Sequence, residues 1–294
     1  MAAQTAEDQV AVRFWGTRGS IATPGPKTLR YGGNTACVEV RLGPHLVVLD
    51  CGTGIRELGI ALGREFNGKP LTAHILLSHT HWDHIQGFPF FVPAYAPQNV
   101  LTICGMPPEG KKLEGVFRVQ MAEEFFPVPL PHLRATVQFC ELPGSLEIGD
   151  AHISAVPVNH PGEAIGYRLE YKGRSIVYVT DHEPYCRVDG ETAENRRLER
   201  DLARFTRNAD LYIREAQYTD EEYAERRGWG HSTFSDALVA ARDACAQAMV
   251  IMHHDPMHDD DCLDRLLNDC RAQAETMQLR TKVDFAYEGL EYHL

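Results

Sequence analysis

The sequence predicts an α/β fold, and three observations support this prediction. Short apolar runs rich in β-branched residues alternate with stretches whose apolar residues recur at helical spacing. Several of these runs end directly before histidine or aspartate, and functional sites of α/β sheets lie at such strand ends. The 294-residue chain is 44% hydrophobic and 24% charged, which is typical of a soluble globular protein with a sizeable core.

The first half is expected to open with antiparallel strands and to continue with a helix. Apolar or alternating segments at 10–14, 37–42 and 46–49 predict the strands. A turn at 50–54 then leads into a helix that places four apolar residues at helical spacing: Ile55, Leu58, Ala61 and Leu62. The apolar run at 73–78 predicts the strand that follows.

Prolines and aromatic residues are concentrated between residues 88 and 134, and this segment is expected to be an insertion. Its two densest stretches are 87–93 and 125–131. They are too apolar for a flexible linker and too interrupted by proline for a core helix. Two interpretations stay open, a lid over the substrate or a contact surface in a homodimer.

The second half is expected to repeat the pattern of strands followed by helices. Strands are predicted near 136–140, 151–158, 165–171, 174–179, 210–213 and 249–252. A helix over 194–208 places Leu198, Leu202 and Phe205 on one face. Two later helices are expected, the first capped by Ser232 or Thr233 and the last by Asp259 or Asp260.

The most informative motif is the hexapeptide His79-Thr80-His81-Trp82-Asp83-His84, which follows the apolar run at 73–78. A straight strand cannot direct four successive ligands to one centre, because its side chains alternate between faces. A strand end that turns into a helix would direct His79 and His81 to one ion and Asp83 and His84 to a second. Imidazole and carboxylate ligands suit zinc, and manganese and iron are alternatives.

The hexapeptide has the His-x-His-x-Asp-His form of the metallo-β-lactamase superfamily, and the rest of the chain resembles that family over roughly 10–290. A lone histidine, an aspartate and a second histidine follow in the family's order, each after an apolar run: His160, Asp181 and His253. The resemblance implies an α/β fold of the αββα sandwich type, in which two mixed β-sheets are flanked by helices. It also implies a metal-dependent hydrolase with two divalent metal ions at one edge.

Carried over to this chain, the resemblance implies a first metal site formed by His79, His81 and His160. It implies a second site formed by Asp83, His84 and His253, with Asp181 bridging the two. The neighbours His182 and His254 compete for the roles of Asp181 and His253. Because Asp181 stands where antibiotic-destroying zinc β-lactamases typically have cysteine, that activity is not expected.

Two cations held close together lower the pKa of a bridging water, so that a hydroxide becomes the nucleophile, and Asp83 can orient it. A proton donor for the leaving group is still needed. Gly230-His231-Ser232-Thr233, together with Arg214-Glu215-Ala216-Gln217, resembles a motif pair of the phosphodiesterase branch, which includes tRNase Z and a cyclic phosphodiesterase of phosphonate breakdown. The resemblance implies that His231 protonates the leaving oxygen and that Glu215 holds His231 and favours its charged form. Arg214 and Gln217 depart from the tRNase pattern.

The N-terminal loops at 16–26 and 30–35 resemble the opening loops of small bacterial members of this branch. Such loops can approach the metal edge. Arg18, Arg30 or Asn34 would then contact a phosphate, although a role in turns is an equal alternative. Ser20 has no assigned role.

Residues 1–9 are polar and lack the apolar centre of a signal peptide, so they are expected to be a disordered lead to a single domain over 10–294. No apolar run is long enough for a membrane span. The eight cysteines include no Cys-x-x-Cys pair, which favours buried thiols in a reducing compartment. We therefore expect a cytoplasmic protein.

The formal net charge of −12 argues against a protein that coats a nucleic-acid backbone, because such binding needs clustered lysine and arginine. The expected partner is a small-molecule phosphodiester such as a cyclic nucleotide, and a nucleic-acid substrate is not expected. Two alternatives stay open. The first is an ester, thioester or lactone hydrolase on the same scaffold, and the second is a metal-containing sensor or redox protein.

Overall fold

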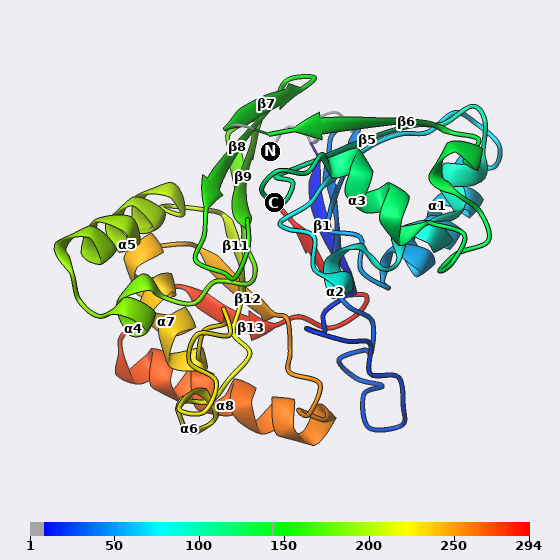
Figure 1. Ribbon diagram of the computed structural model, residues 1–294. Coiled ribbons are helices and arrows are strands. Elements are labelled where there is room, and N and C mark those ends of the chain that lie inside the picture. Colours follow the sequence, from blue (N-terminus) through cyan, green and yellow to red (C-terminus); the bar gives the residue numbers. More distant parts are fainter. Residues whose placement is uncertain (1–8, 143) are drawn as a thin grey trace.

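The computed structural model describes residues 9–142 and 144–294, and two seven-stranded sheets form its centre (Figure 1). The expected disordered lead at 1–9 therefore lies, except for Gln9, outside the described residues. The expectation of a single domain over 10–294 stays a prediction.

The first sheet has the strand order β14-β1-β2-β3-β4-β5-β6. Its strands span Glu291–His293 (β14), Val10–Gly16 (β1), Cys37–Leu42 (β2), His45–Leu49 (β3), Thr72–Leu76 (β4), Val100–Gly105 (β5) and Thr136–Glu141 (β6). The strands β3 to β6 run parallel, whereas β1 pairs antiparallel with both β2 and β14. The C-terminal strand thus closes the edge of the sheet that the N-terminal half builds.

The second sheet has the strand order β13-β12-β11-β10-β9-β8-β7. Its strands span Lys282–Phe285 (β13), Ala248–Met252 (β12), Leu211–Glu215 (β11), Arg174–Val179 (β10), Ile165–Tyr171 (β9), Ala151–Pro157 (β8) and Ser145–Ile148 (β7). The strands β10 to β13 run parallel. Because parallel strands end at the same edge, the residues that follow β10, β11 and β12 are brought together there.

Helices cover the outer face of each sheet, which gives four layers (Figure 1). On the first sheet lie α1 (Ile55–Phe66), α2 (Trp82–Ile85) and α3 (Leu113–Gln120), with the short 3-10 turns Phe88–Phe90, Val92–Tyr95 and Leu130–His132. On the second lie α4 (Tyr185–Asp189), α5 (Ala193–Phe205), α6 (Asp220–Tyr223), α7 (Phe234–Ala244) and α8 (Asp260–Thr276). No helix in the described ranges is long and apolar enough to cross a membrane.

Three apolar clusters follow from this layering. One lies between the sheets and combines residues of both, such as Val40, Leu49, Tyr167 and Val250. The other two lie between each sheet and its own helices. The predicted αββα sandwich with two mixed sheets is therefore confirmed.

Hydrogen bonds at the helix N-termini identify the capping residue of two helices for which the sequence left two candidates each. Thr233 caps α7, because its side chain accepts the backbone N–H of Asp236 and the Asp236 carboxylate accepts the N–H of Thr233. Asp259 caps α8 by accepting the backbone N–H of Cys262.

The expected division into two similar halves is wrong at one strand, because β6, predicted for the second half, pairs with β5 in the first sheet. The strand β5 and the helix α3 lie inside the presumed insertion and were not expected. Phe88, Phe91 and Phe117 of this segment are fully buried in the core under the first sheet. Much of the segment therefore belongs to the helical layer, and both of its suggested roles, as a lid or as a homodimer contact, stay predictions.

Candidate metal centre

The hexapeptide leaves the end of β4 and turns into the short helix α2, as its spacing predicts. His79 and His81 precede this helix, and Asp83 and His84 lie within it. Ligand atoms of His79, His81 and His160 lie within 4.8 Å of one another, and His81 Nδ1 is 3.0 Å from His160 Nε2. The first expected group of ligands is thus brought together, with His160 arriving from the loop after β8.

The second group contains Asp83, His84, Asp181 and His253, whose ligand atoms also lie within 4.8 Å of one another. His253 Nε2 is 3.2 Å from His84 Nε2, 3.1 Å from Asp83 Oδ2 and 3.2 Å from Asp181 Oδ1. All four residues are buried. Such a concentration of imidazole nitrogens and carboxylate oxygens can hold a cation.

Asp181 lies between the two groups and presents one carboxylate oxygen to each. Its Oδ2 is 3.6 Å from His79 Nε2 and 3.8 Å from His160 Nε2. Its Oδ1 is 3.4 Å from His84 Nε2 and 3.2 Å from His253 Nε2. Asp181 adopts a left-handed backbone conformation with φ of 35°, and His253 does so with φ of 64°. Such strained residues persist where the surrounding structure holds them in place.

Asp50 supports the centre from the end of β3. Its carboxylate accepts hydrogen bonds from Ser78 N (2.7 Å), Ser78 Oγ (2.8 Å) and Tyr178 Oη (2.7 Å), and it lies 2.8 Å from His84 Nδ1. These bonds fix the ring of His84 and turn its Nε2 toward the other ligand atoms. Partners of this kind orient metal ligands and increase their basicity.

The remaining histidines are oriented in the same way. His253 Nδ1 lies 3.1 Å from Gln217 Oε1, and His160 Nδ1 lies 2.9 Å from the carbonyl oxygen of Gly230. His79 Nδ1 lies 3.0 Å from Ser78 Oγ, whereas its buried Nε2 has no hydrogen-bond partner among the described residues. His79 Nε2 is thus buried, lies near the Asp181 carboxylate and makes no hydrogen bond. A nitrogen in this position is free to bind a metal ion.

The electrostatics of the centre also fit divalent cations. Burial, and next the charge of His84, lower the pKa of His79 well below its usual value, so its ring is neutral. Burial by itself would raise the pKa of Asp181, but His253, His84 and His79 outweigh it and hold this pKa well below its usual value. Neutral imidazole and ionised carboxylate are the forms that bind metal.

His231 and Glu215 lie beside both groups. His231 Nδ1 is 3.9 Å from Asp181 Oδ2 and 3.9 Å from Glu215 Oε2, and its ring stacks on His253 at 5.1 Å between centroids. Glu215 Oε1 accepts hydrogen bonds from Ser232 N (2.8 Å) and Ser232 Oγ (2.7 Å). The two residues are therefore neighbours, but they form no direct hydrogen bond.

Glu215 was expected to favour the charged form of His231, but the pKa values of both residues are shifted toward their neutral forms. Burial is the largest influence and lowers the pKa of His231 to about 3, against the opposing effect of Asp181. Burial also raises the pKa of Glu215 to about 7. Desolvation disfavours both charged forms and here outweighs the attraction between the two groups.

The competing histidines lie outside the two ligand groups. His254 Nε2 donates to the carbonyl oxygen of Ala286 at 2.8 Å. His182 Nδ1 accepts the backbone N–H of Asn159 at 3.0 Å. The preference for Asp181 and His253 therefore agrees with the geometry.

The three candidate phosphate contacts in the N-terminal loops have protein partners. Arg18 is fully buried and donates to the carbonyl oxygens of Gly32 and His258. Arg30 pairs with Asp261 and Asp264, and Asn34 binds Glu288. The loop nevertheless reaches the centre through Ser20, whose backbone N–H donates to Asp83 Oδ2 at 2.7 Å.

Two further supporting residues were not anticipated. The first is Asp50, whose position before Gly52 indicated only a turn. The second is Glu183, which orders the loop that carries His231. Its carboxylate accepts Gly228 N, Gly230 N and Tyr223 Oη at 2.8, 2.8 and 2.6 Å. Its place two residues after Asp181 was the one available signal.

Comparisons with known proteins agree with this geometry. Residues 45–254 match the family model of the β-lactamase superfamily domain. The ribonuclease Z of Methanosarcina mazei is 24% identical over 322 residues, which cover 90% of this chain and 93% of that protein. Because this relative is named ribonuclease Z, the expectation that nucleic acid is an unlikely partner is doubtful.

Solved structures share the fold. The metallo-β-lactamase fold protein YhfI of Bacillus subtilis superposes with a TM-score of 0.67 at 19% identity, covering 98% of this chain and 100% of that one. A diphosphatase from the PhnP family gives a TM-score of 0.65 at 17% identity, covering 97% of each chain. The chain belongs to the β-lactamase superfamily and is a metal-dependent hydrolase with the metallo-β-lactamase fold, similar over most of its length to phosphodiesterases of that superfamily.

Proposed function

We propose that this chain is a dinuclear metal-dependent phosphodiesterase that hydrolyses a small phosphodiester such as a cyclic nucleotide. The observation that carries the proposal is the position of Asp181, which directs one oxygen to His79 and His160 and the other to His84 and His253. A carboxylate shared between two groups of ligands, all buried except His81, favours two metal ions over one.

In this proposal His79, His81, His160 and Asp181 hold one divalent cation, and Asp83, His84, His253 and Asp181 hold the other. Zinc suits these nitrogen and oxygen donors, and manganese and iron are the alternatives. When bound, the two cations would supply a hydroxide nucleophile and neutralise the phosphate oxygens. Asp83 accepts the backbone N–H of Ser20 at 2.7 Å, which fixes its carboxylate beside His253.

His231 is proposed to protonate the leaving oxygen, and Glu215 is proposed to position it. Both His231 Nδ1 and Glu215 Oε2 are buried and lack a hydrogen-bond partner among the described residues. Their separation of 3.9 Å is one that a small movement would shorten to a hydrogen bond. Catalytic hydrogen bonds are often long before the substrate binds. A hydrogen bond from His231 Nδ1 to Glu215 would favour the charged ring, against the burial that lowers its pKa to about 3, and would leave Nε2 to face the substrate.

Two exposed tryptophans support a nucleotide substrate. Trp82 is 64% exposed and lies next to Asp83, and Trp229 is 60% exposed and lies next to Gly230, whose carbonyl oxygen faces His160. Aromatic faces of this kind stack on nucleobases, with about 1–3 kcal/mol per base. The net charge of −12 favours a small nucleotide over a long RNA backbone.

RNA processing is the second candidate function, because the relative from Methanosarcina mazei is named ribonuclease Z. The two candidates differ in the substrate that the zinc-loaded protein prefers. We expect kcat/KM for 2′,3′-cyclic or 3′,5′-cyclic nucleotides to exceed that for a precursor tRNA. A higher value for the precursor tRNA, with cleavage at its 3′ side, would replace the proposed substrate by RNA.

An ester, thioester or lactone hydrolase on the same scaffold is the remaining alternative. Assaying p-nitrophenyl acetate and a simple lactone with the same preparation separates it from a phosphodiesterase. We expect turnover of the phosphodiesters to depend on Asp181 and to exceed that of the carboxylic esters. Turnover of esters alone would contradict the proposal.

A further inference from the structure

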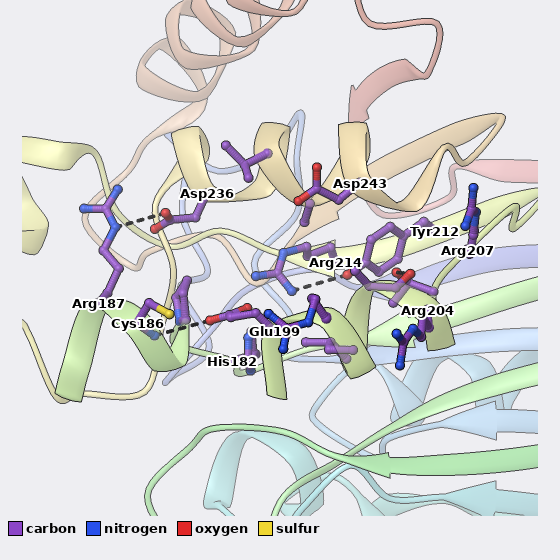
Figure 2. A pocket seen from close by; sticks show the side chains of 17 residues that line it. His182, Cys186, Arg187, Glu199, Arg204, Arg207, Tyr212, Arg214, Asp236 and Asp243 are labelled. Carbon is purple, nitrogen blue, oxygen red and sulfur yellow. Dashed lines mark hydrogen bonds and ion pairs between the residues drawn. The ribbon is translucent and has the colours of Figure 1, made fainter. Parts of the chain in front are cut away.

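A cavity of about 590 Å³ lies on the outer face of the second sheet, between α5 and α7 (Figure 2). Its floor includes Tyr212 and Arg214 of β11, and one end includes His182. Successive side chains of a strand point to opposite faces. Glu215 therefore faces His231 and the metal centre, whereas its neighbour Arg214 faces this cavity. The cavity is distinct from the candidate metal centre.

Two buried hydrogen-bond donors that line the cavity lack partners. The side chain of Arg214 donates from Nη1 to the Tyr212 hydroxyl at 3.3 Å, but its Nε has no partner in the described part of the chain. His182 accepts the backbone N–H of Asn159 at Nδ1, so the hydrogen-bond network places the proton on Nε2, which also has no described partner. Arg214 is 2% exposed and His182 is fully buried.

Among the described residues no carboxylate lies within ion-pair distance of Arg214, although Tyr212, Glu215 and Asp236 are near enough to raise the pKa of its guanidinium against the effect of burial. Asp236 pairs with Arg187 at 3.0 Å, and Asp243 pairs with Arg242 at 2.8 Å. The carboxylate of Glu199 also lines the cavity, where it accepts the backbone N–H of Cys186 at 3.4 Å. Arg214 forms no ion pair with any residue between 9 and 142 or 144 and 294. The buried Nε of Arg214 lacks a hydrogen-bond partner among the described residues, so the guanidinium would gain from an anion that enters the cavity.

Apolar side chains form the walls above these donors. Leu202 and Ala203 of α5 face Val239 and Ala240 of α7 across the cavity. Its volume lies within the range of about 300–1,000 Å³ for sites that bind small molecules. The exposed Arg200, Arg204 and Arg207 also line the cavity, and their positive charge favours the entry of an anion.

We propose that this cavity binds a small organic carboxylate, with the carboxylate group on Arg214 and His182 and the apolar part between α5 and α7. Arg214 is a single buried cation without an ion-pair partner in the described part of the chain, which matches a single negative charge. The planar fork of a guanidinium matches the two oxygens of a carboxylate. A doubly charged phosphate would place additional negative charge near Glu199.

This site is connected to the metal centre through His182. The backbone N–H of His182 donates to Glu215 Oε1 at 3.3 Å, and His182 directly follows Asp181. A carboxylate bound to the His182 ring would therefore lie close to Asp181, which precedes His182, and to Glu215, which accepts the backbone N–H of His182. The cavity is therefore a candidate effector site, from which a bound carboxylate would influence the metal centre through His182.

Calorimetric titration of the metal-loaded protein with octanoate tests the proposal. We expect saturable binding that weakens by about ten-fold or more in Arg214→Met and in Ala240→Trp, which fills the cavity from α7. Arg207→Met, which removes an exposed charge of the cavity lining, is the matched control and should change the affinity by less than about two-fold.

Removing the metal with a chelator distinguishes this site from the metal centre, where a carboxylate could also bind. We expect octanoate to bind the chelated protein as well, and Arg214→Met to weaken this binding by about ten-fold or more. Two results would overturn the proposal: no binding of octanoate at about 10 mM, or equal affinity in wild type and Ala240→Trp. Tighter binding of phenyl phosphate than of octanoate to the chelated protein would overturn the carboxylate assignment.

Discussion

His231 Nδ1 and Glu215 Oε2 face one another at 3.9 Å, and both atoms are buried without a hydrogen-bond partner among the described residues. If His231 protonates the leaving oxygen, its loss should matter most for leaving groups that depart poorly. His231→Ala is expected to lower kcat about 10²–10⁴-fold for a cyclic nucleotide. The same variant should lower kcat much less for bis(p-nitrophenyl) phosphate, whose leaving group needs no proton.

The matched variant is Glu215→Gln, which keeps the shape of the side chain and its bonds to Ser232. It should reproduce part of the loss with the cyclic nucleotide and little of it with the p-nitrophenyl ester. An equal decrease for both substrates in His231→Ala would refute the role as proton donor.

Glu215 also predicts a pH dependence of stability in the metal-free protein. Burial raises its pKa to about 7, so the folded state binds the proton more tightly than the unfolded state does. Its contribution to stability is therefore complete below the unfolded pKa and is lost as the pH rises through about 7. Glu215→Gln should reduce the loss of Tm between pH 5 and pH 8 relative to wild type. An unchanged pH profile would show that Glu215 has an ordinary pKa.

Asp50 is predicted to be essential for metal affinity although it is not a proposed ligand. Asp50→Asn weakens its bonds to His84, Ser78 and Tyr178, and loss of such a partner typically costs about 10–100-fold in metal affinity. Tyr178→Phe removes one of these bonds and should have a smaller effect. Competition with a chromogenic chelator measures both. Wild-type affinity in Asp50→Asn would contradict the role assigned to it.

The positions of most proposed ligands were predictable because they follow apolar strands of the parallel part of a sheet, whereas His160 follows the antiparallel strand β8. Asp181 follows β10 and His253 follows β12, and both were placed from sequence. Asp50 likewise follows a strand, β3, but its role was not predicted because the glycine-rich segment 50–54 indicated only a turn. Its function depends on Ser78 and Tyr178, which are distant in sequence, so no local pattern could show it.

The fold was less predictable in the segment at 88–134. The strand β5 is a short apolar run between proline-rich turns, and its identity depends on pairing with β4 and β6. The contact of Ser20 with Asp83 uses a backbone N–H, which any residue type could supply. Contacts of this kind depend on tertiary structure and leave no signature in the sequence.

Metal affinity should rise with pH. Burial by itself would lower the pKa of His84, but Asp83, Asp181 and Asp50 outweigh it and raise this pKa well above its usual value in the metal-free protein. The pKa of His253 is raised in the same way by Asp181 and Asp83 against the effect of burial. A metal must displace these protons, so its apparent affinity increases until the pH exceeds the raised values. Chelator competition at pH 6 and pH 8 measures the change, and a higher affinity at pH 6 would contradict it.

Hydrolysis of bis(p-nitrophenyl) phosphate by the metal-reconstituted protein, with the metal content measured on the same samples, tests the two-metal phosphodiesterase most directly. Wild type is expected to bind two metal ions per chain and to turn the substrate over at neutral pH. Asp181→Ala, which removes the carboxylate between the two groups of ligands, is expected to lose turnover together with at least one metal ion. Full turnover in Asp181→Ala, or no turnover by wild type with two ions bound, would contradict the proposed phosphodiesterase.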